Sequence, residues 1–168
     1  MDEFVIKAKH YQIVISFLIP TIIAGAIPSA NETIYLIKSI FVFLPSVVWI
    51  FVLGKSLNRC VPGRYRLNET GQTVSIFIFV IAYVTLVMFT AGMIYFTGLA
   101  AFIPLFIIGC YLYLFYFAAK ALVTAEKGKP ASFGEFFGEM ILFIFSILGV
   151  WVFQPRANKL WKANQDKY

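Results

Sequence analysis

One stretch of the sequence, residues 70–119, contains no Asp, Glu, Lys or Arg. A helix that crosses a bilayer needs about 20 mainly apolar residues, so this stretch is long enough to cross twice. Thr97 and Gly98 lie near its middle and favour a turn. The stretch therefore predicts a transmembrane hairpin with helices at residues 74–96 and 99–123.

The composition extends this interpretation to the rest of the chain. Hydrophobic residues make up 61% of the 168 residues and charged residues 13%, whereas about 25% of a soluble domain is charged. Apolar segments at 13–27, 34–53 and 133–153 predict three further membrane helices. We expect a single all-α integral membrane domain, residues 1–168, with four kinked transmembrane helices and a fifth membrane-embedded helix.

Kinks are expected because three prolines lie inside the predicted helices, at Pro20, Pro45 and Pro104. Proline removes a backbone hydrogen bond and clashes with the preceding turn. A kink can open a cavity or a gate. Proline is nevertheless common in membrane helices, so packing geometry is the simpler interpretation.

Local signals bound two of the helices. Asn31 or Thr33 is a suitable N-cap for the second helix. Ser132 and Glu135 fit a capping box at the start of the last helix, in which each side chain bonds a free backbone N–H. Pro155 is expected to end that helix, because proline cannot continue the hydrogen-bond ladder.

The last helix is predicted to enter the membrane and return, or to lie at the interface. Glu135 and Glu139 lie in its first two turns, and a carboxylate deep in a bilayer is costly. Only residues 140–153 are free of charge, which is short for a crossing. The competing interpretation, a plain fifth crossing, would put the basic tail on the far side of the membrane.

The distribution of positive charge predicts the orientation. Lys and Arg collect on the cytoplasmic side of membrane proteins. Basic residues precede the first helix at Lys7 and Lys9, and they recur in the connections 55–73 and 120–129. Four crossings with a cytoplasmic N-terminus place all three groups on the same side.

The C-terminal part resembles a known group of sequences. The stretches 119–122, 126–129 and 133–139 lead to Gly149-Val-Trp-Val-Phe-Gln-Pro-Arg-Ala-Asn158. Together they resemble small uncharacterised bacterial multi-pass membrane proteins with a Gly-x-Trp-x-x-Gln-Pro-Arg-x-Asn ending. The resemblance covers about the last quarter of the chain and implies a bacterial cytoplasmic (inner) membrane protein, without a particular activity.

The residues offer no arrangement typical of catalysis or of metal or cofactor binding. His10 is the only histidine, and Cys60 and Cys110 are not at a metal-ligand spacing, so we expect two free thiols. The membrane segments lack the Asp, Glu and Arg typical of proton relays and ion pathways. We therefore predict a protein that is not an enzyme, without a cofactor, metal or nucleic-acid partner.

Two groups of polar residues are candidate contacts for anionic lipid, another anion or a partner protein. Arg59, Arg64 and Arg66 lie in the longest polar loop, where a purely topological role is the alternative. The second group, in the C-terminal ending, has donors that suit a phosphate or carboxylate, and a simple helix stop with interfacial anchors is the alternative; its members are Gln154, Arg156 and Asn158.

Two features inside the predicted membrane helices remain. Ser75, Ala82, Thr85 and Gly92 recur at helical spacing, and small residues in such a stripe let helices pack closely. Lys38 is the one basic residue well inside a predicted span. It is interpreted as an anion or gating contact, or more simply as a lysine whose ammonium group reaches the interface.

The leading functional hypothesis is an accessory or scaffold subunit that packs with copies of itself or with another membrane protein. One alternative is an oligomeric pore or channel, with a possible role as a membrane effector. A second alternative is a carrier of lipid or of small apolar molecules. Membrane lipids are partners under each hypothesis.

Overall fold

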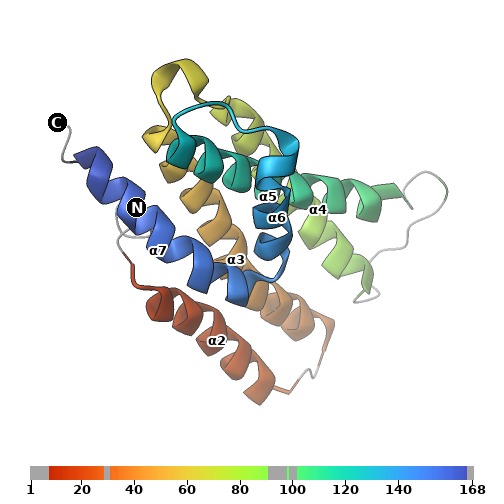
Figure 1. Ribbon diagram of the computed structural model, residues 1–168. Coiled ribbons are helices and arrows are strands. Elements are labelled where there is room, and N and C mark those ends of the chain that lie inside the picture. The colour runs from red at the N-terminus through yellow and green to blue at the C-terminus, as the bar shows by residue number, and fades with distance from the viewer. Residues whose placement is uncertain (1–7, 29–30, 91–97, 99–101, 166–168) are drawn as a thin grey trace.

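The computed structural model describes residues 8–28, 31–90, 98 and 102–165, and these residues form helices and no strand. This confirms an all-helical fold (Figure 1). The elements, in chain order, are α2 (His10–Ala26), α3 (Glu32–Cys60), the 3-10 helix η1 (Gly63–Tyr65), α4 (Glu69–Thr90), α5 (Ile103–Lys127), α6 (Phe133–Ile144) and α7 (Ser146–Gln165).

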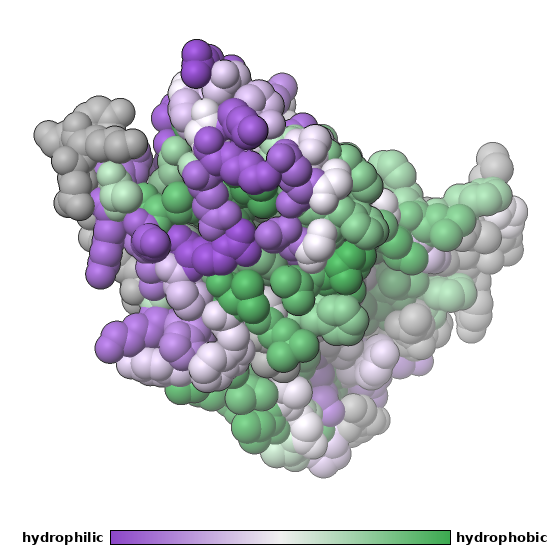
Figure 2. All heavy atoms as spheres, in the orientation of Figure 1, coloured by the Kyte–Doolittle hydropathy of each residue, from purple (hydrophilic) through white to green (hydrophobic). Residues whose placement is uncertain are grey.

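Three helices, α3, α4 and α5, are long and apolar enough to cross a membrane, and α2 is a shorter apolar helix. Large apolar side chains are exposed on all four, for example Ile22, Ile37, Ile81 and Leu105. Figure 2 shows hydrophilic residues gathered towards the end that holds the α3–α4 and α5–α6 connections. An apolar surface of this kind is stable against lipid, which supports a helical membrane protein.

Two helices extend further than expected at the polar end of the bundle. α3 continues past Leu53 to Cys60, and α4 begins at Glu69 rather than at residue 74. Hydropathy locates only the apolar part of a helix, and neither extension contains a proline. At the other end of α3, Asn31 accepts a hydrogen bond from the Ile34 N–H at 2.9 Å, so Asn31 is the N-cap.

The expected kink at Pro104 is wrong. α5 begins at Ile103, and Pro104 lies in its first turn. The N–H groups of a first helical turn have no intrahelical acceptor, so proline causes no loss there. Pro20 and Pro45 do lie inside α2 and α3.

The expected single helix 133–153 is also wrong, because the chain breaks at Phe145 into α6 and α7. At the break, a Cβ atom on Gly149 would lie 2.9 Å from the Leu142 carbonyl oxygen, so a glycine permits this tight junction. The capping box of Ser132 and Glu135 is confirmed at the start of α6.

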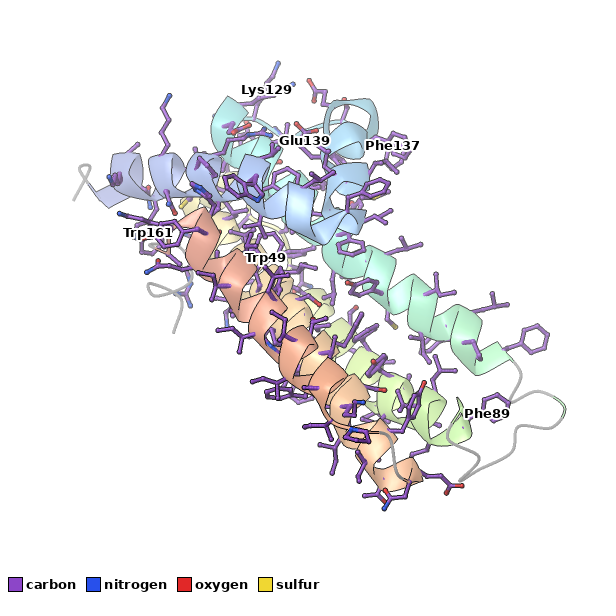
Figure 3. All side chains as sticks on the ribbon, turned by 90° about the horizontal axis from the view of Figure 1, so that it is seen from below. Trp49, Phe89, Lys129, Phe137, Glu139 and Trp161 are labelled. Atoms are coloured by element: carbon purple, nitrogen blue, oxygen red, sulfur yellow. The ribbon has the colours of Figure 1, made fainter. Side chains whose placement is uncertain are left out.

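Pro155 does not end the last helix, since α7 continues to Gln165. The proline ring is exposed on the outside of α7, while Gln154, Arg156 and Asn158 bond to other elements. These tertiary bonds compensate for the backbone bond that Pro155 cannot make. α7 packs against α2, α3 and α6, and it runs across the end of the bundle (Figures 1 and 3).

Aromatic rings fill the interior of the bundle. Phe43 of α3 stacks on Tyr83 of α4 with ring centroids 4.7 Å apart, and Phe79 of α4 stacks on Tyr111 of α5 at 5.0 Å. The series continues through Phe115 to the stacked rings of α6 and α7, Phe143 and Phe153, 3.9 Å apart. These rings connect α3, α4 and α5 with the α6–α7 pair in one core.

Candidate contact sites

Two residues of the C-terminal ending, Gln154 and Asn158, face the interior. They are four residues apart and therefore share one face of α7. The Gln154 side chain is 0% exposed; its oxygen accepts the indole N–H of Trp49 at 3.2 Å, and its amide donates to the Ala8 carbonyl at 3.1 Å. Asn158 donates to the same carbonyl at 3.3 Å. Buried polar groups need such partners, and this junction joins α7 to α3 and to the start of α2.

Arg156 lies on a different face of α7 and forms an ion-pair cluster. Its Nε and Nη2 atoms donate to the two carboxylate oxygens of Glu126 at 2.7 and 2.6 Å, and Nη2 also donates to Glu139 at 3.3 Å. Hydrogen bonds to Glu126 raise the pKa of Arg156 further above its ordinary value. Bidentate pairs of this type fix geometry as well as charge. Arg156 thereby joins the middle of α7 to the end of α5 and to the middle of α6.

The three candidate residues of the ending are therefore adjacent in sequence but divided in space. Gln154 and Asn158 form a buried tertiary junction, and Arg156 is paired with two carboxylates. Arg156 also lines an open pocket of about 400 Å³ with Lys159. This pocket gives an anion or a partner protein access to Arg156 of the C-terminal ending.

The loop arginines lie around η1, at the end of α3. Arg59, Arg64 and Arg66 are exposed. The Arg66 guanidinium donates to the Arg59 carbonyl at 3.2 Å, and that of Arg64 lies 4.5 Å from the centroid of the Tyr65 ring. Their charges therefore face outward, as a contact with anionic head groups or an acidic partner requires.

A buried residue that the sequence analysis missed holds this loop in place. The Asn58 side chain accepts from the Leu67 N–H at 2.8 Å and donates to the Leu67 carbonyl at 3.0 Å and to Glu69 at 3.2 Å. Polar and basic residues flank Asn58, so the composition of this stretch indicated only a solvated loop.

The basic connections lie at the same end of the molecule. Figure 1 shows η1 and the α5–α6 connection together there, and Figure 2 shows the hydrophilic side chains that gather around them. Lys127 pairs with Glu135 across the α5–α6 connection at 2.6 Å. This hydrogen bond, with those to Ser132, lowers the pKa of Glu135 to about 2.

The predicted small-residue stripe is only partly buried. Ala82 belongs to the core, whereas Ser75 and Thr85 are half-buried, and Thr85 donates to the Ile81 carbonyl of its own helix at 2.9 Å. Gly92 lies outside the described residues. The inward face of α4 instead carries larger side chains, including Phe79 and Val87.

Close helix packing occurs at other glycines. A Cβ atom on Gly54 of α3 would lie 2.6 Å from Nε2 of Gln72 in α4, and one on Gly71 of α4 would lie 2.6 Å from the Tyr113 hydroxyl oxygen in α5. Gly54 precedes the predicted polar connection 55–73 and Gly71 lies within it, so the sequence analysis did not predict close packing at either glycine.

Lys38 lies in an open pocket between α2, α3 and α4, near the far end of the bundle. Its ammonium donates to the carbonyl of Ile27, the C-cap residue of α2, at 2.6 Å. The Tyr83 hydroxyl donates to the Ser39 carbonyl at 3.2 Å in the same pocket. The ammonium thus caps a helix end as well as bordering a concave surface.

Both cysteines are free, as expected, and no group of three or more His, Cys, Asp or Glu in the part of the chain described here could hold a metal ion. Comparisons with protein families, curated proteins and solved structures found no match. The resemblance of the stretches between residues 119 and 158 to bacterial membrane proteins stays a prediction from the sequence.

Proposed function

We propose that this chain is a bacterial inner-membrane protein in which α2, α3, α4 and α5 cross the bilayer and the N-terminus is cytoplasmic. α6 and α7 then form a re-entrant or interfacial cap on the cytoplasmic side. The ion pair between Arg156 and Glu126 supports this topology, because it returns α7 to the end where α5 finishes.

We propose further that it acts as a non-enzymatic accessory or scaffold subunit. The packed aromatic core is the observation that carries this proposal. Stacked rings such as Phe79–Tyr111 and Phe143–Phe153 occupy the space between the helices. Side chains that fill the interior leave the outer surface for binding, and closely packed protein interiors are rigid.

Two outer surfaces suit partners. The exposed apolar faces of α4 and α5, with Phe77, Ile81 and Leu105, suit a transmembrane helix of a second copy or of another membrane protein. The exposed arginines around η1 suit an acidic segment of that partner or anionic lipid at the membrane surface.

Photocrosslinking in intact cells tests the proposal. A photoreactive amino acid at Ile81, which is 68% exposed on α4, is expected to form an adduct with one defined membrane protein or with a second copy. The same amino acid at the exposed Ile22 of α2 is the matched control for non-specific contact. Adducts with lipid alone at Ile81 contradict the scaffold role.

Reconstitution of the purified chain in liposomes separates a scaffold from a pore. We expect no ion conductance above that of empty liposomes. Stable single-channel conductance that depends on protein density would favour an oligomeric pore and count against the scaffold.

A further inference from the structure

The junction between α6 and α7 has an outer face made of large apolar side chains. Phe145 is the C-cap residue of α6, and α7 begins at the next residue. We call this junction the elbow; its exposed apolar residues, with 39–61% of their surfaces accessible, are Ile144, Phe145, Leu148, Trp151 and Val152. Residues 140–155 include no charged residue. A contiguous apolar surface of this kind is unfavourable in water, so an apolar partner is expected to cover it.

Aromatic contacts on the inner side of the elbow define its depth in the bundle. The centroid of the Phe143 ring lies 5.9 Å from that of Trp49 in α3 and 6.4 Å from that of Phe115 in α5. Trp49 is eleven residues before Cys60, where α3 ends. Phe115 is twelve residues before Lys127, where α5 ends. With a rise of about 1.5 Å per residue, Phe143 therefore packs about 16–18 Å from the polar ends of both helices.

Ion pairs before and after the elbow lie at the polar end of the bundle. Before it, Glu135 of α6 pairs with Lys127 at the end of α5. After it, Arg156 of α7 pairs with Glu126, also at the end of α5. The chain therefore runs inward through α6, turns at the elbow and returns through α7 (Figures 1 and 3). This is the path of a re-entrant hairpin.

The depth of the elbow corresponds to the acyl-chain region of one leaflet. α3 has 29 residues, which at about 1.5 Å per residue gives a length of about 43 Å. A bilayer with its headgroup regions is about 40–45 Å thick, and its hydrocarbon core is about 30 Å thick. Each headgroup region is thus about 5–8 Å deep, and a depth of about 16–18 Å lies below the headgroups and short of the midplane.

We propose that the outer face of the elbow contacts lipid acyl chains in the cytoplasmic leaflet. The proposal rests on the four-crossing topology proposed above, and it names what the α6–α7 cap contacts. A lipid chain extends through one leaflet, as the elbow does, whereas a crossing helix of a second copy would meet the elbow over only part of its length. Acyl chains therefore match the extent of this face better than a partner helix does.

The elbow face also adjoins the apolar outer surface of α2. The Trp151 ring lies 4.3 Å from the His10 ring between centroids, and the His10 ring lies 6.0 Å from that of Tyr11. Tyr11 and Ile15 are exposed on α2. The lipid that surrounds α2 is therefore able to extend over the elbow without a break.

Site-directed spin labelling of the full chain in liposomes of phosphatidylethanolamine and phosphatidylglycerol tests the proposal. The background is Cys60→Ser with Cys110→Ala, which removes both native thiols. One nitroxide label is attached to a cysteine at Leu148, which is 61% exposed. Molecular oxygen concentrates in the acyl chains, and a neutral nickel chelate stays in water. We expect the Leu148 label to collide more often with oxygen than with the nickel chelate.

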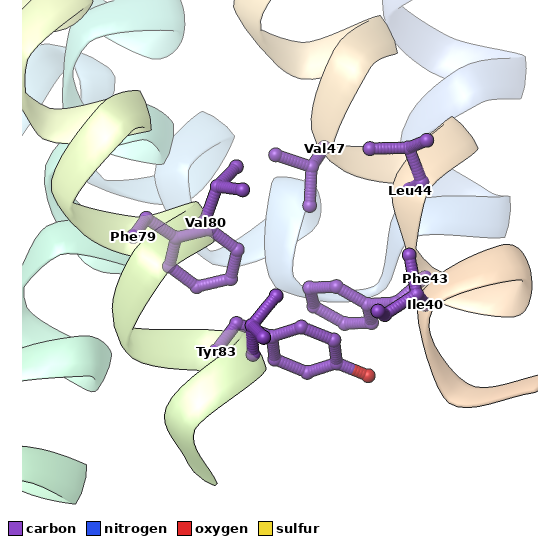
Figure 4. A pocket seen from close by; sticks show the side chains of 8 residues that line it. Ile40, Phe43, Leu44, Val47, Phe79, Val80 and Tyr83 are labelled. Carbon is purple, nitrogen blue, oxygen red and sulfur yellow. The ribbon is translucent and has the colours of Figure 1, made fainter. Parts of the chain in front are cut away.

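Two control positions report lipid and water in the same protein. Val80 lines the apolar groove between α3 and α4 and is 39% exposed (Figure 4). It is eleven residues from the start of α4 at Glu69, which is about 16 Å along the helix and matches the depth of the elbow. Lys129 is exposed in the α5–α6 connection. A label at Val80 should collide mainly with oxygen, and one at Lys129 mainly with the nickel chelate.

The Val80 control separates failure of this proposal from failure of the topology. Nickel contact at Leu148 with oxygen contact at Val80 would mean that the elbow faces water. Contact with neither reagent at Leu148 would mean that protein covers it. Either result would overturn the lipid contact alone, whereas nickel contact at Val80 as well would overturn the four-crossing topology and this proposal with it.

A second comparison distinguishes a re-entrant elbow from helices that lie flat at the interface. Phe133 at the start of α6 and Lys159 of α7 are exposed on the two sides of the elbow. The ratio of oxygen to nickel collisions should be highest at Leu148 and lower at both of these positions. Equal ratios at all three would overturn the proposal. A label at Val152 of the same face repeats the measurement, and thermal unfolding checks that each labelled protein is folded.

Discussion

Arg156 and Glu126 are thirty residues apart in the sequence and form a bidentate ion pair, with N–O distances of 2.7 and 2.6 Å. An unbroken helix from Ser132 would carry Arg156 about 36 Å away, at about 1.5 Å per residue. The break at Phe145 brings it back instead. This pair therefore defines the path of the C-terminal quarter of the chain.

Reversal of this ion pair should be partly rescued by the complementary change. Arg156→Glu places a carboxylate beside Glu126 and Glu139, and we expect the free energy of unfolding to fall by about 1–3 kcal/mol. Adding Glu126→Arg restores one opposite-charge pair and should recover part of the loss. Thermal unfolding in detergent measures both, and a double variant no more stable than the single one would contradict the pairing.

Removal of the Gln154 amide should lower the free energy of unfolding more than the small change in side-chain volume suggests. Gln154→Leu keeps a similar volume but removes the acceptor for the Trp49 indole and the donor to the Ala8 carbonyl. Unpaired buried polar groups cost about 1–3 kcal/mol each. The exposed Lys159→Ala on the same helix is the control and should change the melting temperature little. Equal melting temperatures for the two variants would contradict the junction.

A methyl group on Gly54 should disturb the contact between α3 and α4. The new Cβ atom of Gly54→Ala would lie 2.6 Å from Nε2 of Gln72 and 3.3 Å from the Phe117 ring. Overpacking of this kind costs about 1–3 kcal/mol. Gly109→Ala in α5 meets no atom within 4 Å and should be neutral or stabilising by up to about 1 kcal/mol. Thermal unfolding of the two variants in one detergent gives the comparison.

The Lys127–Glu135 pair predicts a dependence of stability on pH. The pKa of Glu135 is lowered from 4.5 to about 2, chiefly by its hydrogen bond from Lys127. Because the folded pKa is the lower one, its contribution to stability is present above pH 4.5 and lost as the pH falls towards 2. Glu135→Gln should therefore be less stable than the wild type at neutral pH, with the difference shrinking below pH 4.5. A constant difference from pH 7 to 3 would contradict this assignment.

The sequence predicted the features that depend on local composition. The apolar runs located α2, α3, α4 and α5, and the short polar signals at Asn31 and Ser132 located two helix starts. These signals act within one or two helical turns, so neighbouring residues are sufficient to recognise them.

Features that depend on distant partners were not predictable in this way. Proline disfavours the interior of a helix. Hydrogen bonds from Gln154 to Ala8 and from Arg156 to the carboxylates of α5 and α6 nevertheless hold α7 in place on both sides of Pro155. Gly54 and Asn58 have their roles only because α4 and the η1 loop pack against them. For the same reason, the pairing of Lys38 with the end of α2 is visible only in the folded chain.

The last prediction concerns the side of the membrane on which the C-terminal tail lies. If α6 and α7 enter and return, the end of α7 lies with the basic connections 55–73 and 120–129, which the positive-inside tendency places in the cytoplasm. A reporter active only in the periplasm, fused after Tyr168, should then be inactive, and a cytoplasmic reporter at the same position should be active. A cysteine placed at Arg64, which is exposed near η1, should resist impermeant thiol reagents added to intact cells and react after lysis. Periplasmic activity after Tyr168 together with a protected residue 64 would mean that the tail crosses, and the Arg156–Glu126 pair could not then exist in the membrane.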